Sequence, residues 1–172
     1  MPHGCCQKEF SVEGFSDADW ASQKDRHSIL GYTFYFSQGV VSWSSKRQHI
    51  IALSSTESEY IAQTHAAREV IWMKNFINEI RGPQGKAIRI YCDNQGAIML
   101  AKDNKFHSQT KHIDLCYHFV REEVEDNKIR FNYIQMDENV MDIFTKALPR
   151  PRFMGFVESL GLRDGGKEQR EQ

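Results

Sequence analysis

The spacing of the apolar residues changes several times along the chain, and each spacing predicts a different element. Three early stretches are rich in the aromatic and β-branched residues typical of β-strands: EGFSDADW at 13–20, GYTFYF at 31–36 and VVSWSS at 40–45. Gly39, with the polar residues before it, predicts a hairpin between the second and third strands. The following segment has the 3-4-3 spacing of an amphipathic helix, carried by Val70, Met73, Ile77 and Ile80. The stretch RGPQG ends that helix.

The second half of the chain alternates between strand-like and helix-like patterns. The predicted elements are a strand at 87–93, a helix at 95–102, a helix at 113–124, a strand at 128–135, a short helix at 138–149 and one more helix at 152–162. Up to the short helix, the order is β-β-β-α-β-α-α-β-α. This order predicts an α/β fold, a mixed sheet with helices on its faces.

The composition fits one domain of moderate size. The chain has 172 residues, of which 40% are apolar and 26% are charged. We expect a leader at 1–11, the domain at 12–162 and a disordered tail at 163–172. The four cysteines form no C-x-x-C pair, and no apolar run approaches the roughly 18 residues of a membrane span. These features predict an intracellular protein with reduced thiols and no membrane partner, and leave open whether it lies in a cytoplasmic particle or in the nucleus.

The basic residues and histidines offer only weak candidate sites. Because the formal net charge is −1, binding to nucleic acid must rest on local patches. Lys46 and Arg47, near Trp43, are one candidate patch, and an exposed strand end is the alternative. Four potential zinc ligands fall within a short stretch: His107, His112, Cys116 and His118. They lack the paired spacing of a zinc site, so phosphate contact by Lys111 and His112, or a solvated surface, is the preferred interpretation.

The acidic residues fall at the ends of neighbouring predicted elements. These are Asp17 in the first strand, Glu57 and Glu59 in the first turn of the long helix, Asp93 at the end of the fourth strand, and Asp142 in the first turns of the short helix. Each alone has a local explanation, such as a helix cap or a favourable helix-dipole position. Carboxylates gathered without basic partners repel one another unless a cation is bound. Hard oxygen ligands favour Mg²⁺ or Mn²⁺, and a pair of such ions cleaves phosphodiesters. The set therefore predicts a two-metal nuclease.

The start of the long helix leaves one choice open. Ser54-x-x-Glu57 and Thr56-x-x-Glu59 both have the form of a capping box, in which a hydroxyl and a carboxylate bind free amides at the start of a helix. Local chemistry alone does not say which glutamate is free to face a metal.

Seven stretches resemble, in order, the signature blocks of the ribonuclease H domain in copia-type LTR retrotransposon polyproteins. They are SDADWA, GYTFYF, VSWSSKRQ, ALSSTESEY, YCDNQGAI, FHSQTKHIDLCYHFVRE and MDIFTKALP, and the resemblance runs from about Glu13 to Leu162. It implies a ribonuclease H-like mixed five-stranded sheet, with three antiparallel strands and then parallel strands. It also implies two Mg²⁺ or Mn²⁺ ions, hydrolysis of the RNA strand of RNA–DNA hybrids, and a reverse transcriptase domain of the parent polyprotein as partner.

The resemblance also implies site residues. Asp17, Asp93 and Asp142 match the family's strand and helix aspartates, while Asp19 ranks second on the expectation that it points to the opposite face of its strand. The family's glutamate is followed by an apolar residue and, three positions on, by a small one, and Glu59 fits that pattern whereas Glu57 does not. Glu59 is therefore the expected ligand and Glu57 the expected cap. The expected substrate contacts are Ser55, Thr56, Asn94, Gln95 and Lys111.

Some features depart from the family or favour other interpretations. The stretch IQMDENVMD lacks the histidine-containing loop of many ribonucleases H, which puts histidine-assisted proton transfer in doubt. Lys146 is expected to compensate a helix dipole. The Tyr-x-Asp-Asp signature of a reverse transcriptase is absent, so we expect a lone domain: a fragment, a truncated gene model or a domesticated remnant. A non-catalytic scaffold of the same fold is the main alternative, and DNA strand transfer, as in integrases, is a further one.

Overall fold

The computed structural model describes residues 11–20, 25–37, 39–83, 85–102 and 111–162, with the side chains of 111–114 excepted. The strands are β1 Val12–Asp19, β2 Ile29–Phe36, β3 Gly39–Arg47, β4 Ile88–Cys92 and β5 Ile129–Tyr133. The helices are α1 Ser55–Arg81, α2 Gln95–Lys102, α3 Lys111–Glu125, the 3₁₀-helix η1 Met136–Glu138, α4 Asp142–Thr145 and α5 Arg150–Ser159. The predicted tail, and the predicted leader except Ser11, lie outside the described residues.

The five strands form one mixed sheet in the order β3-β2-β1-β4-β5. The pairs β1–β2 and β2–β3 are antiparallel, whereas β1–β4 and β4–β5 are parallel. The predicted fold class, three antiparallel strands followed by parallel ones, is thereby confirmed. Because β1 and β4 are parallel neighbours, their carboxyl ends meet at the same edge of the sheet.

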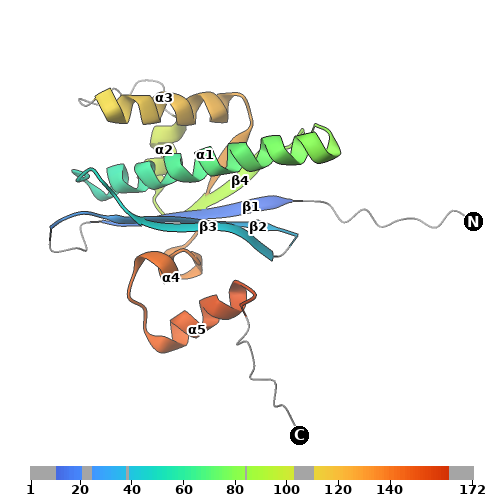
Figure 1. Cartoon of the computed structure of the whole chain (residues 1–172). Coiled ribbons are helices and arrows are strands. Elements are labelled where there is room, and N and C mark those ends of the chain that lie inside the picture. The colour runs from blue at the N-terminus through green and yellow to red at the C-terminus, as the bar shows by residue number, and fades with distance from the viewer. Residues whose placement is uncertain (1–10, 21–24, 38, 84, 103–110, 163–172) are drawn as a thin grey trace, which may run out of the picture.

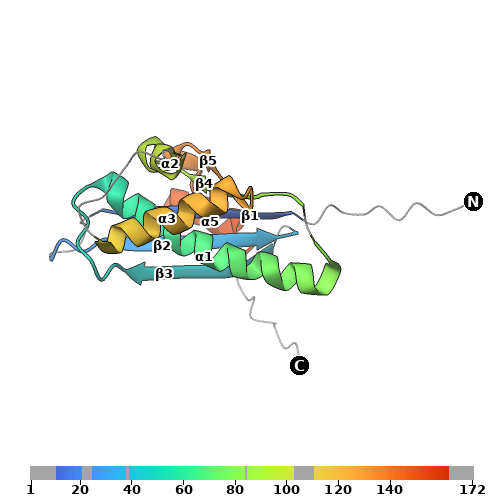
Figure 2. The ribbon, with the colours of Figure 1, turned by 90° about the horizontal axis from the view of Figure 1, so that it is seen from above.

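Helices cover both faces of the sheet (Figure 1). The helices α1, α2 and α3 lie on one face, where the main core includes Phe34, Tyr60, Ile90 and Val120. The helices α4 and α5 lie on the other face, where Val140, Phe156 and Leu160 form a smaller core. Viewed from above, α1 crosses over β1 and β2 while α2 lies near β5 (Figure 2). The strands β1 and β2 therefore send alternate side chains into two different cores.

Two glycines permit close approaches across the sheet. A Cβ atom on Gly14 would lie 2.1 Å from the Phe34 ring, so β1 gives the ring space in the main core. On the other face, a Cβ atom on Gly31 would lie 2.4 Å from the Met141 methyl and 3.0 Å from the Ser44 carbonyl oxygen. Gly31 thus lets the segment before α4 pack directly on the sheet.

The helix predicted at 138–149 differs from the observed structure. Only the 3₁₀ turn η1 and the four-residue α4 form there, and between them Asn139 has an extended backbone. The Asn139 side chain explains the break, since it accepts a hydrogen bond from the Met141 N–H at 3.2 Å and donates one to the Ser16 carbonyl at 3.2 Å. A buried side chain thus replaces helical backbone bonding at this point.

The remaining predicted elements are confirmed within a few residues. The long helix begins after Ser54 and ends at Gly82, whose φ of 84° is readily adopted only by glycine. None of the helices in the described ranges is both long and apolar enough to cross a bilayer. Cys92 and Cys116 are free thiols.

Candidate active site

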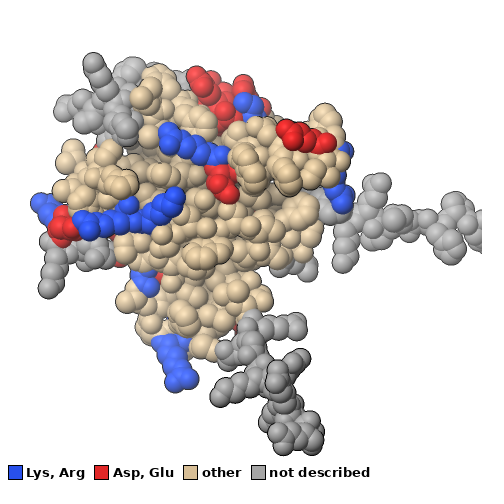
Figure 3. Space-filling model, viewed as in Figure 1, with Lys and Arg blue, Asp and Glu red and all other residues tan. Residues whose placement is uncertain are grey.

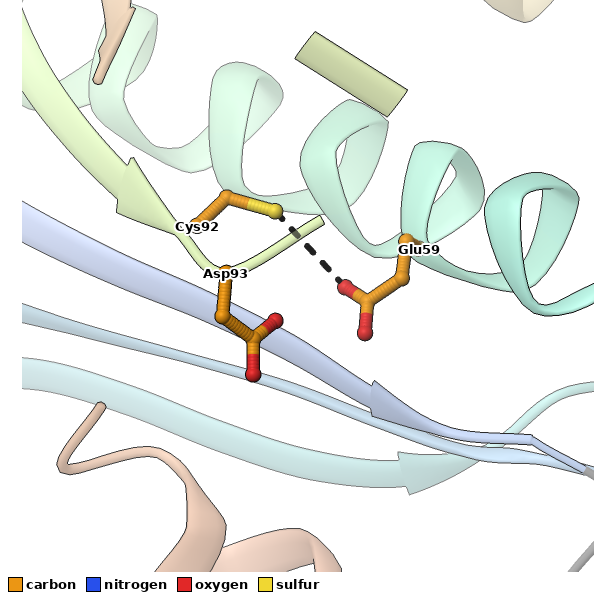
Figure 4. A group of neighbouring side chains, drawn as sticks. All are labelled: Glu59, Cys92 and Asp93. Atoms are coloured by element: carbon orange, nitrogen blue, oxygen red, sulfur yellow. Dashed lines mark hydrogen bonds between the residues drawn. The ribbon is translucent and has the colours of Figure 1, made fainter. Parts of the chain in front are cut away.

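Four acidic side chains from four elements lie at the edge where β1 and β4 end. Asp17 is near the end of β1, Asp93 directly follows β4, Glu59 is in the first turns of α1, and Asp142 begins α4. Oxygen atoms of Asp17, Asp93 and Asp142 all lie within 4.8 Å of one another. The same limit holds for ligand atoms of Glu59, Cys92 and Asp93 (Figure 4). Asp93 belongs to both groups and therefore connects them.

The two glutamates in the first turns of α1 have different roles. The Glu57 N–H donates to Ser54 Oγ at 3.1 Å, and Glu57 Oε2 accepts from the Leu53 N–H at 2.6 Å. This reciprocal pair confirms that Glu57 caps the helix. Glu59 is only 5% exposed, and its carboxylate accepts from the Ala18 N–H and from the Cys92 thiol, at 3.8 Å. Glu59 therefore faces the end of β1 and the acidic group rather than the helix terminus.

Asn139 and Thr145 position the aspartates. Asn139 is fully buried, bonds to β1 through the Ser16 carbonyl and also hydrogen-bonds the Asp93 carboxylate. The Thr145 hydroxyl donates to Asp17 Oδ2. The segment between β5 and α5 is thus tied to both strands that carry an aspartate.

Two basic side chains reach the acidic group, which was not expected from the sequence. Lys146 Nζ lies 3.2 Å from Asp17 Oδ1 and 2.6 Å from Asp142 Oδ1. Arg152 lies 2.6 Å from Asp142 Oδ2. The premise that the carboxylates lack basic partners is therefore wrong, and so is the assignment of Lys146 to the helix dipole alone. The four-residue spacing from Asp142 to Lys146 was the available signal.

The surroundings raise the pKa values of three of the acids. Burial raises the pKa of Asp17 to about 6, although Lys146 and the Thr145 hydroxyl act in the opposite direction. Burial, followed by the charges of Asp17 and Asp93, raises the pKa of Glu59 well above its ordinary value. Burial also raises the pKa of Asp93, against the effect of Lys146. Each of these carboxylates is therefore costly to ionise until further positive charge arrives.

Apart from the Cys92 sulfur, the potential ligand atoms in the two groups are all carboxylate oxygens. Hard divalent cations such as Mg²⁺ or Mn²⁺ prefer such oxygen ligands. Four carboxylates face only two basic side chains, so negative charge remains to be neutralised. Cys92 is not counted as a ligand, because sulfur is a soft donor and hard divalent ions prefer oxygen. Burial, reinforced by Glu59, also raises the pKa of its thiol.

Four of the residues expected to contact substrate lie at the starts of α1 and α2, beside this edge: Ser55, Thr56, Asn94 and Gln95. Ser55 and Gln95 are exposed at the first positions of α1 and α2. Asn94 accepts a hydrogen bond from the Ala97 N–H at 3.0 Å and so caps α2. A Cβ atom on Gly96 would lie 3.2 Å from Thr56 Oγ1, which places the starts of the two helices side by side. The side chain of Lys111 lies outside the described residues.

Asp19 ends β1 and belongs to neither of the ligand groups formed by the described residues. It was expected on the opposite face from Asp17, but residues two apart share a strand face, so that reason was wrong. Of the zinc candidates, His107 and the side chain of His112 lie outside the described part of the chain.

No model of a known protein family matches the chain. It is 45% identical over 152 residues to the retrovirus-related Pol polyprotein from transposon TNT 1-94 of Nicotiana tabacum, an alignment covering 88% of this chain and 11% of that protein. It is 36% identical over 164 residues to the corresponding polyprotein from transposon RE1 of Arabidopsis thaliana, which covers 93% of this chain and 11% of that protein. The chain thus spans about a tenth of the length of these relatives.

Solved structures share the fold at low sequence identity. Ribonuclease H1 from the archaeon Halobacterium salinarum NRC-1 superposes with a TM-score of 0.53 at 14% identity, covering 75% of this chain and 89% of that one. The LC11 ribonuclease H1, solved in complex with an RNA/DNA hybrid, gives a TM-score of 0.58 at 12% identity, covering 78% of this chain and 94% of that one.

Proposed function

We propose that this chain, a ribonuclease H-like domain whose homologues are the retrovirus-related Pol polyproteins of plant transposons, is a metal-dependent endonuclease acting on the RNA strand of RNA–DNA hybrids. The homologues and the fold confirm the resemblance to the ribonuclease H domain of copia-type polyproteins. Within a parent polyprotein, the domain would remove RNA template in cooperation with a reverse transcriptase domain. The products would carry 5′-phosphate and 3′-hydroxyl ends.

One observation carries the proposal: Asp93 is common to two groups of potential ligands at the same edge of the sheet. Asp17, Asp93 and Asp142 would hold one divalent ion, and Glu59 with Asp93 would hold a second. Such ions activate a water molecule and stabilise the leaving oxygen of a phosphodiester.

The protein's own residues keep the carboxylates in place. Asn139 and Thr145 fix the orientations of Asp93 and Asp17 through hydrogen bonds. Lys146 and Arg152 limit the repulsion among the aspartates. Ser55 and Thr56 would contact the hybrid, where polar side chains can recognise the 2′-hydroxyl in the minor groove.

A non-catalytic scaffold is the alternative, and the acids disfavour it. Asp17 and Asp142 are fully buried and Glu59 is 5% exposed, an arrangement that costs stability when the carboxylates are ionised. A purely structural domain gains nothing from that cost. Apolar residues of similar size would serve such a domain better.

The test uses the purified chain with an end-labelled RNA strand annealed to DNA. Cleavage is expected with Mg²⁺ or Mn²⁺ and is expected to stop with EDTA. Asp93→Asn should lower the cleavage rate by more than about 100-fold. Mutating a residue that only hydrogen-bonds a metal ligand costs about 10- to 100-fold, and Asp93 would be a ligand itself. Glu57→Gln, which changes an acid two positions from Glu59 but outside the site, is the matched control and should stay close to wild type. Folded wild-type protein that never cleaves the hybrid with either metal would overturn the proposal.

A further inference from the structure

Arg152, in the first turn of α5, reaches back to the acidic site. Its Nη2 lies 2.6 Å from Asp142 Oδ2 and donates to the Met136 carbonyl at 2.7 Å. The guanidinium also lies over the Phe156 ring, 5.3 Å from its centroid. One side chain therefore connects η1, α4 and α5, the three elements that follow β5.

We propose that Arg152 is a positioning residue of the metal site, which holds the Asp142 carboxylate in the orientation in which that acid can bind a divalent ion. The inference deepens the proposed function and rests on it for the identity of the ion. It makes α5 a part of the site, although none of the four acids of the site lies on that helix.

The start of α5 is held in place independently of Asp142. Pro149 is the N-cap of the helix and Pro151 lies in its first turn, so the φ angles of both residues are restricted. One turn further on, Phe156 anchors the helix in the smaller core. Arg152 therefore reaches the carboxylate from a fixed base.

The two oxygens of Asp142 face different cations. Lys146 Nζ lies 2.6 Å from Asp142 Oδ1 and 3.2 Å from Asp17 Oδ1, so it occupies the space between the two acids. Arg152 contacts the other oxygen, Asp142 Oδ2. Asp17 is arranged in the same way, since the Thr145 hydroxyl donates to its Oδ2. The two Oδ1 atoms are thus the ones left for an ion once Lys146 moves away, and the Arg152 contact can persist.

Burial gives the Arg152 contact its directional effect. The Asp142 side chain is 1% exposed and that of Arg152 is 30% exposed, so the acid end of the pair is shielded from water. On the face shown in Figure 3, little acidic side chain is visible over α4 and α5. A guanidinium is planar and its donors are fixed in direction, so its hydrogen bond to a carboxylate is oriented. Arg152 can therefore set the orientation of Asp142 as well as its charge balance.

A role in charge balance alone makes the opposite prediction. A cation beside a carboxylate weakens the binding of a further cation, so removing Arg152 would then strengthen Mg²⁺ binding. Removing a hydrogen-bond partner that orients a metal ligand instead weakens binding, usually by about 10- to 100-fold. The sign of the change in Mg²⁺ affinity therefore separates positioning from charge.

The experiment is calorimetric titration of Mg²⁺ into the full chain without nucleic acid, at a temperature where each variant is folded. Arg152→Gln should weaken Mg²⁺ binding by about 10- to 100-fold. Lys146→Met, which removes the cation between Asp17 and Asp142, should instead strengthen it by about 5-fold or more, from the lower end of usual coupling energies. Arg150→Gln is the matched control, because Arg150 is exposed two positions away on the same helix, and it should bind Mg²⁺ like wild type.

A further variant separates geometry from charge. Arg152→Lys keeps the charge but lacks the planar donor geometry, so it should also bind Mg²⁺ more weakly than wild type. Wild-type affinity in this variant, or unchanged or tighter binding by folded Arg152→Gln, would overturn the positioning role. A loss in Lys146→Met equal to that in Arg152→Gln would overturn it too, because the two cations would then act alike.

The titration does not depend on cleavage. A chain that shows these differences in Mg²⁺ affinity but never cuts the hybrid would leave the positioning role intact and overturn only the proposed function. A chain that cuts the hybrid but binds Mg²⁺ equally well without Arg152 would overturn only the positioning role. Wild-type protein that binds no Mg²⁺ would overturn both.

Discussion

At the scale of single residues, Lys146 places a positive charge inside the acidic site. A buried site made only of ionised acids would destabilise the folded chain unless cations were bound. Here Lys146 Nζ already contacts Asp17 and Asp142. Burial alone would favour the neutral amine, but the two carboxylates dominate and hold the pKa of Lys146 above its ordinary value. The ammonium group therefore acts as an internal counter-ion of the metal-free protein.

Replacing Lys146 should make stability depend on metal. In EDTA, Lys146→Met should lower the free energy of unfolding by about 3 kcal/mol, since buried Asp17 loses its ion pair and Asp142 is left with Arg152. With Mg²⁺ present, bound ions should supply the missing charge and shrink that loss. Urea unfolding in both conditions measures the difference, and Lys102→Met on the exposed side of α2 is the control. An equal loss with and without Mg²⁺ would contradict the counter-ion role.

Asp17 should give the metal-free protein an unusual dependence on pH. Its pKa is about 6 in the folded chain and ordinarily 3.8, so the folded state binds the proton more tightly. The resulting stabilisation is fully present below about pH 3.8 and is lost as the pH rises through about 6. The difference amounts to about 3 kcal/mol at most.

The measurement is the free energy of unfolding in EDTA across this pH range, for wild type and for Asp17→Asn. The variant cannot titrate at this position, so its stability should fall less as the pH rises. Mg²⁺ should lower the pKa of Asp17 in the folded wild type and so remove the loss of wild-type stability as the pH rises, because bound cations favour the ionised carboxylate. Parallel profiles in EDTA would show that the Asp17 proton does not contribute.

At the scale of elements, the sequence indicated most of the framework. The strands and the long helix are marked by residue type, spacing and the caps at Ser54 and Gly82, all of which are local signals. The choice of Glu59 over Glu57 rested on a family pattern and agrees with the observed cap. The division of the 138–149 segment was not predictable, because it depends on Asn139 bonding to Ser16, a residue more than a hundred positions earlier.

Asn139 should control the position of α4 relative to the sheet. Asn139→Ala removes the bonds to Ser16 and Met141 and leaves the buried Ser16 carbonyl without that donor. We expect a loss of about 1–3 kcal/mol in unfolding free energy. We also expect the apparent Mg²⁺ affinity to fall by about 10- to 100-fold, the range for outer-shell partners of metal sites.

Calorimetric titration of Mg²⁺ at a temperature where the variant is fully folded separates the two effects. Ser159→Ala is a suitable control, since its hydroxyl donates within α5, to the Gly155 carbonyl. A variant that loses stability but binds Mg²⁺ like wild type would limit Asn139 to a structural role.

At the scale of the whole molecule, the two ends of the sheet differ in character. The end where β1 and β4 finish holds the acids. Towards the other end, an apolar groove of about 410 Å³ lies between β3 and the second half of α1, lined among others by Val41, Trp72, Phe76 and Ile80. Helical spacing predicted a core-facing position for Ile80. Ile80 is instead 64% exposed, and Trp72 and Phe76 are 59% and 50% exposed.

This groove should dominate the apolar surface of the chain without stabilising its fold. Trp72 and Phe76 stack on each other with ring centroids 5.6 Å apart, and an exposed stack of this kind binds apolar probes. Trp72→Gln/Phe76→Gln should therefore reduce the fluorescence of an apolar dye and the tendency of the protein to associate at high concentration. The free energy of unfolding should change by less than about 1 kcal/mol, since both side chains are half exposed. Leu115→Gln, which removes an exposed leucine from α3, should leave dye binding unchanged. A large loss of stability in the double variant would instead mean that the stacked rings belong to the core.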